Sequence, residues 1–187
     1  MKIKPEKIVL MGYMASGKST VGRALAEKIK LPFFDLDHYV SEQEGMSITK
    51  IFDEKGEPYF RKKELLYLEK LLTSESSFVL AVGGGTPTFF GAMELINKYS
   101  LSVYLKASVQ TLFERLLPKS IERPLLTKIP DQALQEYIAV HLFERSAYYF
   151  KSTVQVEIDH KSIETIVEEL VGILETNNQW QFKQDLN

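Results

Sequence analysis

A glycine-rich segment near the N-terminus constrains the fold of this chain more than any other feature. Gly12-Tyr-Met-Ala-Ser-Gly17-Lys18-Ser19 fits the phosphate-binding loop pattern G-x-x-x-x-G-K-[ST] and directly follows an apolar run at residues 8–11. The residues after the loop are apolar at intervals of four, as on one face of an amphipathic helix. The chain therefore begins with a strand, a tight loop and a helix, which is the start of an α/β fold.

A loop of this kind holds phosphate because its glycines let successive backbone N–H groups point into one concavity, at the positive end of the next helix. Lys18 is expected to reach the β- and γ-phosphates of a nucleotide, and the Ser19 hydroxyl to ligate Mg²⁺. The alternative is a chance turn, against which the flanking strand and helix argue. The predicted nucleotide-binding residues in the loop are Gly12, Ala15, Ser16, Gly17, Lys18, Ser19 and Thr20.

Strand-like and helix-like segments alternate along the rest of the chain. Further strands are predicted at residues 33–35, 78–82, 101–105 and 154–158, and helices at 18–30, 47–72, 88–98, 108–116, 131–150 and 162–175. This order predicts a three-layer αβα fold with a five-stranded parallel sheet and helices on both faces. Ligands of such sheets bind at the carboxyl ends of the strands.

The prediction is one domain over residues 1–175, followed by a tail at 176–187 to which no role is assigned. A polar, proline-bearing segment at about 117–130 is either an ordinary connection or, in a kinase, a mobile lid.

Composition excludes several classes of protein. The net charge of -2 provides no field for nucleic acid, and the absence of cysteine rules out a disulfide framework, a thiolate metal site and a cysteine nucleophile. The apolar run near the N-terminus is too short for a signal peptide or a membrane span. The histidines do not cluster, so no histidine metal site is expected. We expect a cytoplasmic monomer with no nucleic-acid or membrane partner.

Two carboxylates follow the second predicted strand. If the extended geometry persists, Asp35 and Asp37 project from the same face, where one can serve Mg²⁺ and the other a substrate hydroxyl. The alternative is a helix start near His38, because Asp is a favoured N-cap residue. Both readings can hold together, since a cap formed by one carboxylate leaves the other available.

Three consecutive glycines, Gly83, Gly84 and Gly85, follow the third predicted strand, so the backbone can approach a ligand closely there. The alternative is a flexible turn, which does not require three glycines. Arg61 is either a ligand-binding residue or an exposed helix charge that pairs with Glu57 or Glu64. These features together indicate a small-molecule or nucleotide kinase and do not identify the acceptor.

The whole set of motifs, in this order, resembles the shikimate kinase family from residue 7 to about residue 174. The matching segments are GYMASGKSTVGR at 12–23, FDLD at 34–37, GMSI at 45–48, IF at 51–52, GE at 56–57, FR at 60–61, GGG at 83–85, RPLL at 123–126 and ER at 144–145. The first motif is shared by a very large superfamily, whereas the combination is much more specific.

The resemblance implies a function and an acceptor site. Members of this family transfer the γ-phosphate of MgATP to the 3-hydroxyl of shikimate, giving shikimate 3-phosphate and ADP in the chorismate pathway to aromatic amino acids. By resemblance Asp37 binds the shikimate hydroxyls, Arg61 and Arg145 bind its carboxylate, and the glycine run, with Gly84 at its centre, lies against the substrate. A guanidinium suits that carboxylate because it forms a planar, forked pair.

On the nucleotide side the resemblance places Asp35 near the Mg²⁺ held through Ser19, and Arg123 on the phosphates from a mobile lid. The implied catalytic residues are Lys18, Asp37 and Arg123, with Mg²⁺ as the cofactor of the ATP co-substrate. Catalysis of such a transfer comes mainly from alignment and from cations on the phosphoryl oxygens.

The sequence departs from the family pattern at several positions. Ala15 stands where the family often has glycine, and Ser41 where it is frequently acidic. The nucleotide-side arginine of the lid has no clear counterpart, with Arg115 and Lys119 as the nearest candidates, and the loop at 159–162 is a candidate for adenine contacts. Alternatives are a kinase for another hydroxylated acid such as gluconate, a nucleoside monophosphate kinase, or a non-catalytic ATP-binding module.

Overall fold

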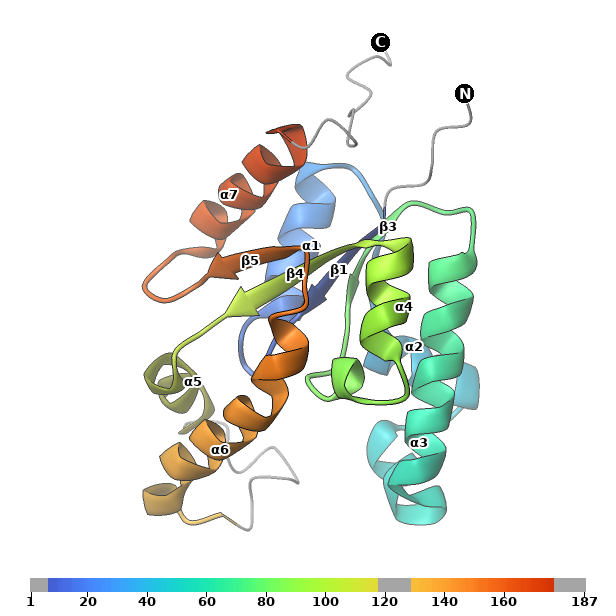
Figure 1. Ribbon diagram of the computed structural model, residues 1–187. Coiled ribbons are helices and arrows are strands. Elements are labelled where there is room, and N and C mark those ends of the chain that lie inside the picture. The colour runs from blue at the N-terminus through green and yellow to red at the C-terminus, as the bar shows by residue number, and fades with distance from the viewer. Residues whose placement is uncertain (1–6, 118–128, 177–187) are drawn as a thin grey trace.

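A five-stranded parallel sheet lies at the centre of the computed structural model, which describes residues 7–117 and 129–176 (Figure 1). Its order is β2-β3-β1-β4-β5. The strands are β1 (Lys7–Met11), β2 (Phe33–Asp35), β3 (Phe78–Ala81), β4 (Leu101–Lys106) and β5 (Val154–Glu157). The prediction of a five-stranded parallel sheet is confirmed, with strand ends that differ by at most one residue.

Helices cover both faces of the sheet. Helices α1 and α7 lie together on one face and α3 and α4 on the other, while α5 and α6 lie beyond the arrowhead end of β4 (Figure 1). Their bounds are α1 (Lys18–Lys28), α2 (Leu36–Glu44), α3 (Ile48–Thr73), the 3₁₀ turn η1 (Thr86–Thr88), α4 (Ala92–Tyr99), α5 (Val109–Leu116), α6 (Asp131–Tyr149) and α7 (Ile163–Thr176). The segment predicted as one helix at 88–98 is divided between η1 and α4.

Strand β1 is the centre of the core. Ile8 and Leu10 are buried in the hydrophobic cluster that includes α1 and α7, whereas Val9 and Met11 are buried in the cluster on the opposite face. This alternation follows from the two-residue period of a strand, with both faces of the sheet covered by helices. Because β3 and β2 lie on one side of β1 and β4 and β5 on the other, the switch point at which such sheets bind ligands lies at the carboxyl end of β1.

Helix α3 is interrupted by a residue that is not helical. Gly56 has φ 79° and ψ 168°, a conformation that favours glycine, and divides α3 into two helical stretches. Pro58 follows near the start of the second stretch, where its missing N–H removes no helical hydrogen bond. The break therefore sets the direction in which the second stretch presents Arg61.

Parts of two predictions lie outside the described residues. Most of the lid predicted at about 117–130, including Arg123, belongs to the segment 118–128, and nearly all of the tail predicted at 176–187 belongs to 177–187. Within the described chain, no helix combines the length and the apolar character needed to cross a lipid bilayer.

Candidate active site

The loop between β1 and α1 has the backbone that its glycines predict. Gly12 and Gly17 have φ values of 148° and 92°, and Gly17 is the N-cap of α1. Ala15 also has a positive φ, 61°, so the alanine is tolerated at the expense of modest strain. The Lys18 ammonium lies across the loop and donates to the carbonyl oxygens of Gly12 and Tyr13 at 3.0 and 2.9 Å.

A cavity of about 650 Å³ opens at the carboxyl ends of β1, β2 and β3, as predicted for the bound ligands. It is lined by six residues of the phosphate-loop segment and by residues from several other elements. The lining is Met14, Ala15, Ser16, Gly17, Lys18, Ser19, Thr20, Val21, Asp35, Asp37, Val82, Gly83, Gly84, Arg115, Lys161, Ile163 and Ile166. Loop, carboxylate pair and glycine run therefore share one cavity.

The carboxylate pair joins the phosphate loop to α2. Asp35 is the N-cap of α2 and accepts the Asp37 amide at Oδ1, while its Oδ2 accepts the Ser19 hydroxyl at 2.6 Å. The extended geometry that would have put both carboxylates on one strand face is wrong, because the cap ends β2 at Asp35 and Asp37 lies in the first turn of α2. The helix-start alternative is correct, and both side chains still line the cavity.

Burial in the cavity changes the protonation of Asp37. Desolvation, followed by the negative charges of Glu64 and Asp35, raises the pKa of the Asp37 carboxyl from 3.8 to about 6, against the opposing effect of Lys18 and Arg61. A carboxylate with this pKa is ionised at neutral pH and is a better proton acceptor than an ordinary aspartate. Asp37 thus has the properties of a general base.

Arg61 is fixed by two carboxylates on its own helix. Its Nε and Nη2 donate to Glu57 Oε1 at 3.2 and 3.1 Å, and its Nη1 donates to Glu64 Oε2 at 2.9 Å. Both ion pairs considered from the sequence, with Glu57 and with Glu64, therefore form. They do not hold Arg61 away from the glycine run. A Cβ at Gly85 would lie 2.9 Å from Arg61 Nη2, so the guanidinium rests directly on the glycine run.

Arg145 approaches the same glycine run from α6. A Cβ at Gly84 would lie 3.5 Å from its Nη1 and 3.3 Å from the backbone nitrogen of Met14. The guanidinium carbon of Arg145 also lies 5.5 Å from the centre of the Tyr13 ring, a cation–π geometry. The backbone of Gly84 consequently lies between the phosphate loop and the Arg145 guanidinium, in close contact with both.

Several residues around the site were not predicted. Glu64 is only 2% exposed, holds Arg61 through Oε2 and accepts the Thr86 hydroxyl through Oε1 at 2.6 Å. The Tyr149 hydroxyl donates to the Gly84 carbonyl, which anchors the glycine run to α6. The sequence signal for Glu64 was its three-residue spacing from Arg61, which also describes an ordinary surface pair.

The part of the cavity wall formed by α5, α7 and the loop before α7 has its own polar residues. Arg115 donates through Nη1 to the Ala15 carbonyl at 3.3 Å, which places α5 against the phosphate loop. Lys161, from the 159–162 loop that was a candidate for adenine contacts, lines the cavity with Ile163 and Ile166. Of the two lid-side cations considered from the sequence, Arg115 is in the cavity wall and Lys119 lies outside the described residues.

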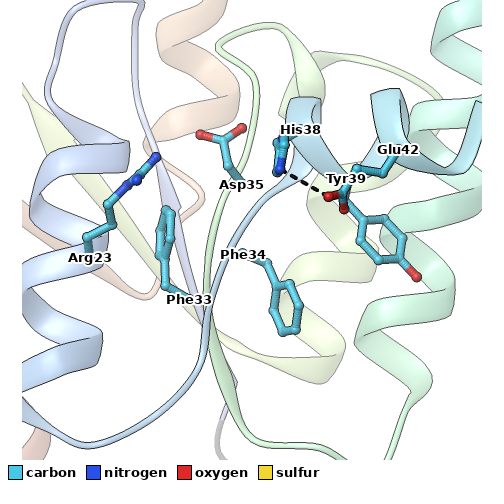
Figure 2. Close-up of a pocket in the computed structure, with 7 residues that line it drawn as sticks. All are labelled: Arg23, Phe33, Phe34, Asp35, His38, Tyr39 and Glu42. Carbon is cyan, nitrogen blue, oxygen red and sulfur yellow. Dashed lines mark ion pairs between the residues drawn. The ribbon is translucent and has the colours of Figure 1, made fainter. Parts of the chain in front are cut away.

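A second hollow, of about 610 Å³, lies along the edge strand β2 and shares Asp35 with the main cavity (Figure 2). Figure 2 shows Arg23 and Phe33 on one side of the strand and Phe34 on the other. The guanidinium carbon of Arg23 lies 5.4 Å from the centre of the Phe33 ring. The hollow ends at the ion pair between His38 and Glu42 on α2. Among the predicted site residues that the structure describes, Asp35 alone lines this hollow.

Comparison with known proteins identifies close relatives over nearly the whole chain. A family model described as shikimate kinase matches residues 14–175. A shikimate kinase from Flavobacterium psychrophilum is 44% identical over 170 residues, which cover 90% of this chain and 99% of that protein. A crystal structure of shikimate kinase from Bacteroides thetaiotaomicron matches with a TM-score of 0.83 at 34% identity, covering 91% of this chain and 98% of that chain. Shikimate kinase from Acinetobacter baumannii in complex with shikimate matches with a TM-score of 0.84 at 28% identity, covering 94% and 96%.

Proposed function

The chain belongs to the shikimate kinase family, and we propose that its cavity transfers the γ-phosphate of MgATP to the 3-hydroxyl of shikimate, giving shikimate 3-phosphate and ADP. One observation carries the assignment of the site. Arg61 and Arg145 come from different helices and meet on the same glycine run, next to Asp37 and across one backbone from the phosphate loop. Two guanidinium groups beside a carboxylate base suit a hydroxylated carboxylic acid.

In the proposed acceptor site, Arg61 and Arg145 bind the shikimate carboxylate and Gly83, Gly84 and Gly85 allow the ring to approach the backbone. Asp37 orients the 3-hydroxyl and takes its proton as the new P–O bond forms. Its pKa of about 6 supports this role. The carboxyl is ionised at neutral pH, and its pKa lies close enough to neutral pH for it to accept a proton readily.

In the proposed nucleotide site, the amides of Gly12, Ala15, Ser16, Gly17, Lys18, Ser19 and Thr20 surround the phosphates. Lys18 exchanges the two loop carbonyls for phosphate oxygens and neutralises the charge that develops on them. Arg123, which lies outside the described residues, is proposed to contribute a second charge from the lid. Arg115 and Lys161 border the end of the cavity where the base is expected.

Mg²⁺ fits the residues present. The Ser19 hydroxyl and the Asp35 carboxylate are hard oxygen ligands and already lie 2.6 Å apart. We propose that Ser19 holds the ion directly and that Asp35 holds it directly or through its water. When bound, the ion neutralises charge on the β- and γ-phosphate oxygens.

The cellular form is proposed to be a cytoplasmic monomer. The absence of cysteine fits a reducing compartment, and a net charge of -2 supplies no attraction for nucleic acid or anionic membranes. Analytical ultracentrifugation with and without MgATP and shikimate measures the mass, and a dimer would contradict the proposal.

An acceptor panel tests the function. ADP release is measured with MgATP and shikimate, quinate, gluconate or CMP, together with mass analysis of the product. Turnover of shikimate no faster than that of the other acceptors would overturn the proposed substrate. ATP binding without any phosphorylated product would indicate a non-catalytic module.

Two variants test the acceptor arginine. Arg61→Ala is expected to raise the KM for shikimate at least tenfold, since a charged, bidentate contact is lost. Lys62→Ala removes an exposed cation next to it and serves as the matched control. An unchanged shikimate KM in Arg61→Ala would contradict the carboxylate role.

A further inference from the structure

The guanidinium of Arg61 lies over two aromatic rings. Its central carbon is 4.4 Å from the centre of the Phe89 ring and 5.2 Å from that of Phe60. Phe60 belongs to a hydrophobic core cluster, so its position is explained by packing. Phe89 belongs to neither cluster of the described chain, and its ring contacts are with Arg61 and with Phe90, whose ring centre is 6.1 Å away.

A rigid turn carries Phe89 to this position. The Thr88 hydroxyl donates to the Gly85 carbonyl at 2.7 Å, and the Thr88 amide donates to the same oxygen at 3.0 Å. After Phe89 the chain reverses through Phe90, with φ 48°, and Gly91, with φ 74°. Phe90 is 67% exposed, so no burial of its ring compensates for the left-handed backbone. Strain that persists without a packing gain is found preferentially at functional sites.

The hydrogen bonds of Arg61 act in the plane of the guanidinium and leave its faces to other groups. Glu57 is 54% exposed, and an ion pair with so exposed a partner holds a side chain weakly. Glu64 contributes one firm bond, about which the guanidinium can still turn. The rings of Phe60 and Phe89 pack close to the guanidinium and restrict that rotation.

We infer that Phe89 is a positioning residue for the acceptor carboxylate, acting through Arg61. Its ring holds the guanidinium plane so that the edge next to Gly85 faces the acceptor. The ring also keeps water from the side of the cation that it contacts. A forked guanidinium–carboxylate pair needs this alignment, and a partly desolvated cation binds the anion more strongly. The inference rests on the proposed role of Arg61.

Steady-state kinetics of three variants test the inference. Phe89→Ala is expected to raise the shikimate KM roughly three- to thirtyfold, the range of a cation–π contact, with the MgATP KM and the melting temperature nearly unchanged. Phe89→Tyr keeps a ring and is expected to restore the KM to within about twofold. Phe90→Ala removes the neighbouring ring and is the matched control, with an unchanged shikimate KM.

A double variant separates positioning from a general structural role. In an Arg61→Ala background, Phe89→Ala is expected to add no further increase in the shikimate KM, because the group it positions is absent. An additive increase would overturn the inference, as would equal changes in both KM values and kcat for Phe89→Ala alone.

The same measurements distinguish this inference from the proposed function. If Arg61→Ala raises the shikimate KM and Phe89→Ala does not, Phe89 has no positioning role and the acceptor site stands. If neither variant changes it, the acceptor role of Arg61 is wrong and the inference falls with it.

Discussion

Replacing Asp37 by asparagine is expected to make the free protein more stable at neutral pH while it removes the activity. The reason is the raised pKa of this carboxyl, about 6, which desolvation causes first and the charges of Glu64 and Asp35 second. The ionised form is disfavoured in the folded protein relative to the unfolded chain. Asparagine has nearly the same shape and carries no charge, so this unfavourable energy disappears.

The magnitude follows from the shift. A rise from 3.8 to about 6 is about 2 units, and at about 1.4 kcal/mol per unit the ionised carboxylate lowers the free energy of unfolding by about 3 kcal/mol. The charge also lies in the first turn of α2, where the helix dipole favours it by about 0.5 kcal/mol. This opposing contribution reduces the gain to about 2.5 kcal/mol, so burial outweighs the dipole.

The pH dependence has a definite sign. The pKa of Asp37 is higher in the folded protein than in the unfolded chain. The contribution of this carboxyl to the stability of the wild-type protein is therefore fully present below pH 3.8 and is lost as the pH rises through about 6. The advantage of Asp37→Asn is therefore greatest at pH 7.5, falls to about half at pH 5 and nearly vanishes below the unfolded pKa. In the wild type, kcat/KM for shikimate should fall about tenfold from pH 7 to pH 5, with the fraction of ionised Asp37.

Urea unfolding of both proteins at pH 7.5 and pH 5 measures the difference. Asp53→Asn removes one negative charge at an exposed position of α3 and is the control for net charge. Initial rates at both pH values, with saturating MgATP, follow the activity. The reasoning is refuted if Asp37→Asn is no more stable than the wild type at pH 7.5, or if the difference does not depend on pH.

Three further predictions concern single contacts. Lys18→Met should reduce turnover on the order of 10³-fold with an unchanged circular dichroism spectrum, and near-normal turnover would refute the phosphate-loop assignment. Gly85→Ala should raise the shikimate KM about tenfold without backbone strain, because the new Cβ lies 2.9 Å from Arg61 Nη2 and φ is -89°. An unchanged KM would show that Arg61 moves aside. Ala15→Gly should raise the free energy of urea unfolding by about 0.5 kcal/mol, since relief at φ 61° exceeds the added unfolded-state entropy, and a loss of stability would contradict this.

The sequence predicted the architecture because local and global signals agree in this chain. Apolar runs bounded by glycine, proline or polar residues mark buried parallel strands, and the amphipathic stretches between them require helices. The common location of loop, carboxylates and glycines followed from the parallel sheet, since their strands end on one side. The order of the strands did not follow, because it depends on which faces pack across the whole molecule.

Asp35 and Glu64 show where the sequence left the local structure open. A three-residue strand is too short for its period to continue into the next residues, so the capping energy at Asp35 decided the local structure. For Glu64, the break at Gly56 resets the phase of α3, and a face counted from residue 47 no longer predicts which side of the second stretch is buried. In both cases one residue outside the regular pattern redirected a functional side chain.

Glu64 lies between the two groups that are proposed to act on the acceptor, Arg61 and Asp37. Its Oε2 holds Arg61 in place, and its buried charge contributes to raising the pKa of Asp37. A neutral residue here would leave Arg61 with the exposed Glu57 as its partner, and a carboxylate at 2% exposure without its partners would carry a large desolvation cost. The carboxylate is therefore tolerated because Arg61 and Thr86 satisfy it, and its field makes the nearby base more basic. Burial at Asp37 lowers the stability of the fold and gives the carboxyl a pKa close to neutral, as its proposed role as proton acceptor requires. The buried Glu64 carboxylate also orients Arg61, the proposed ligand of the substrate carboxylate.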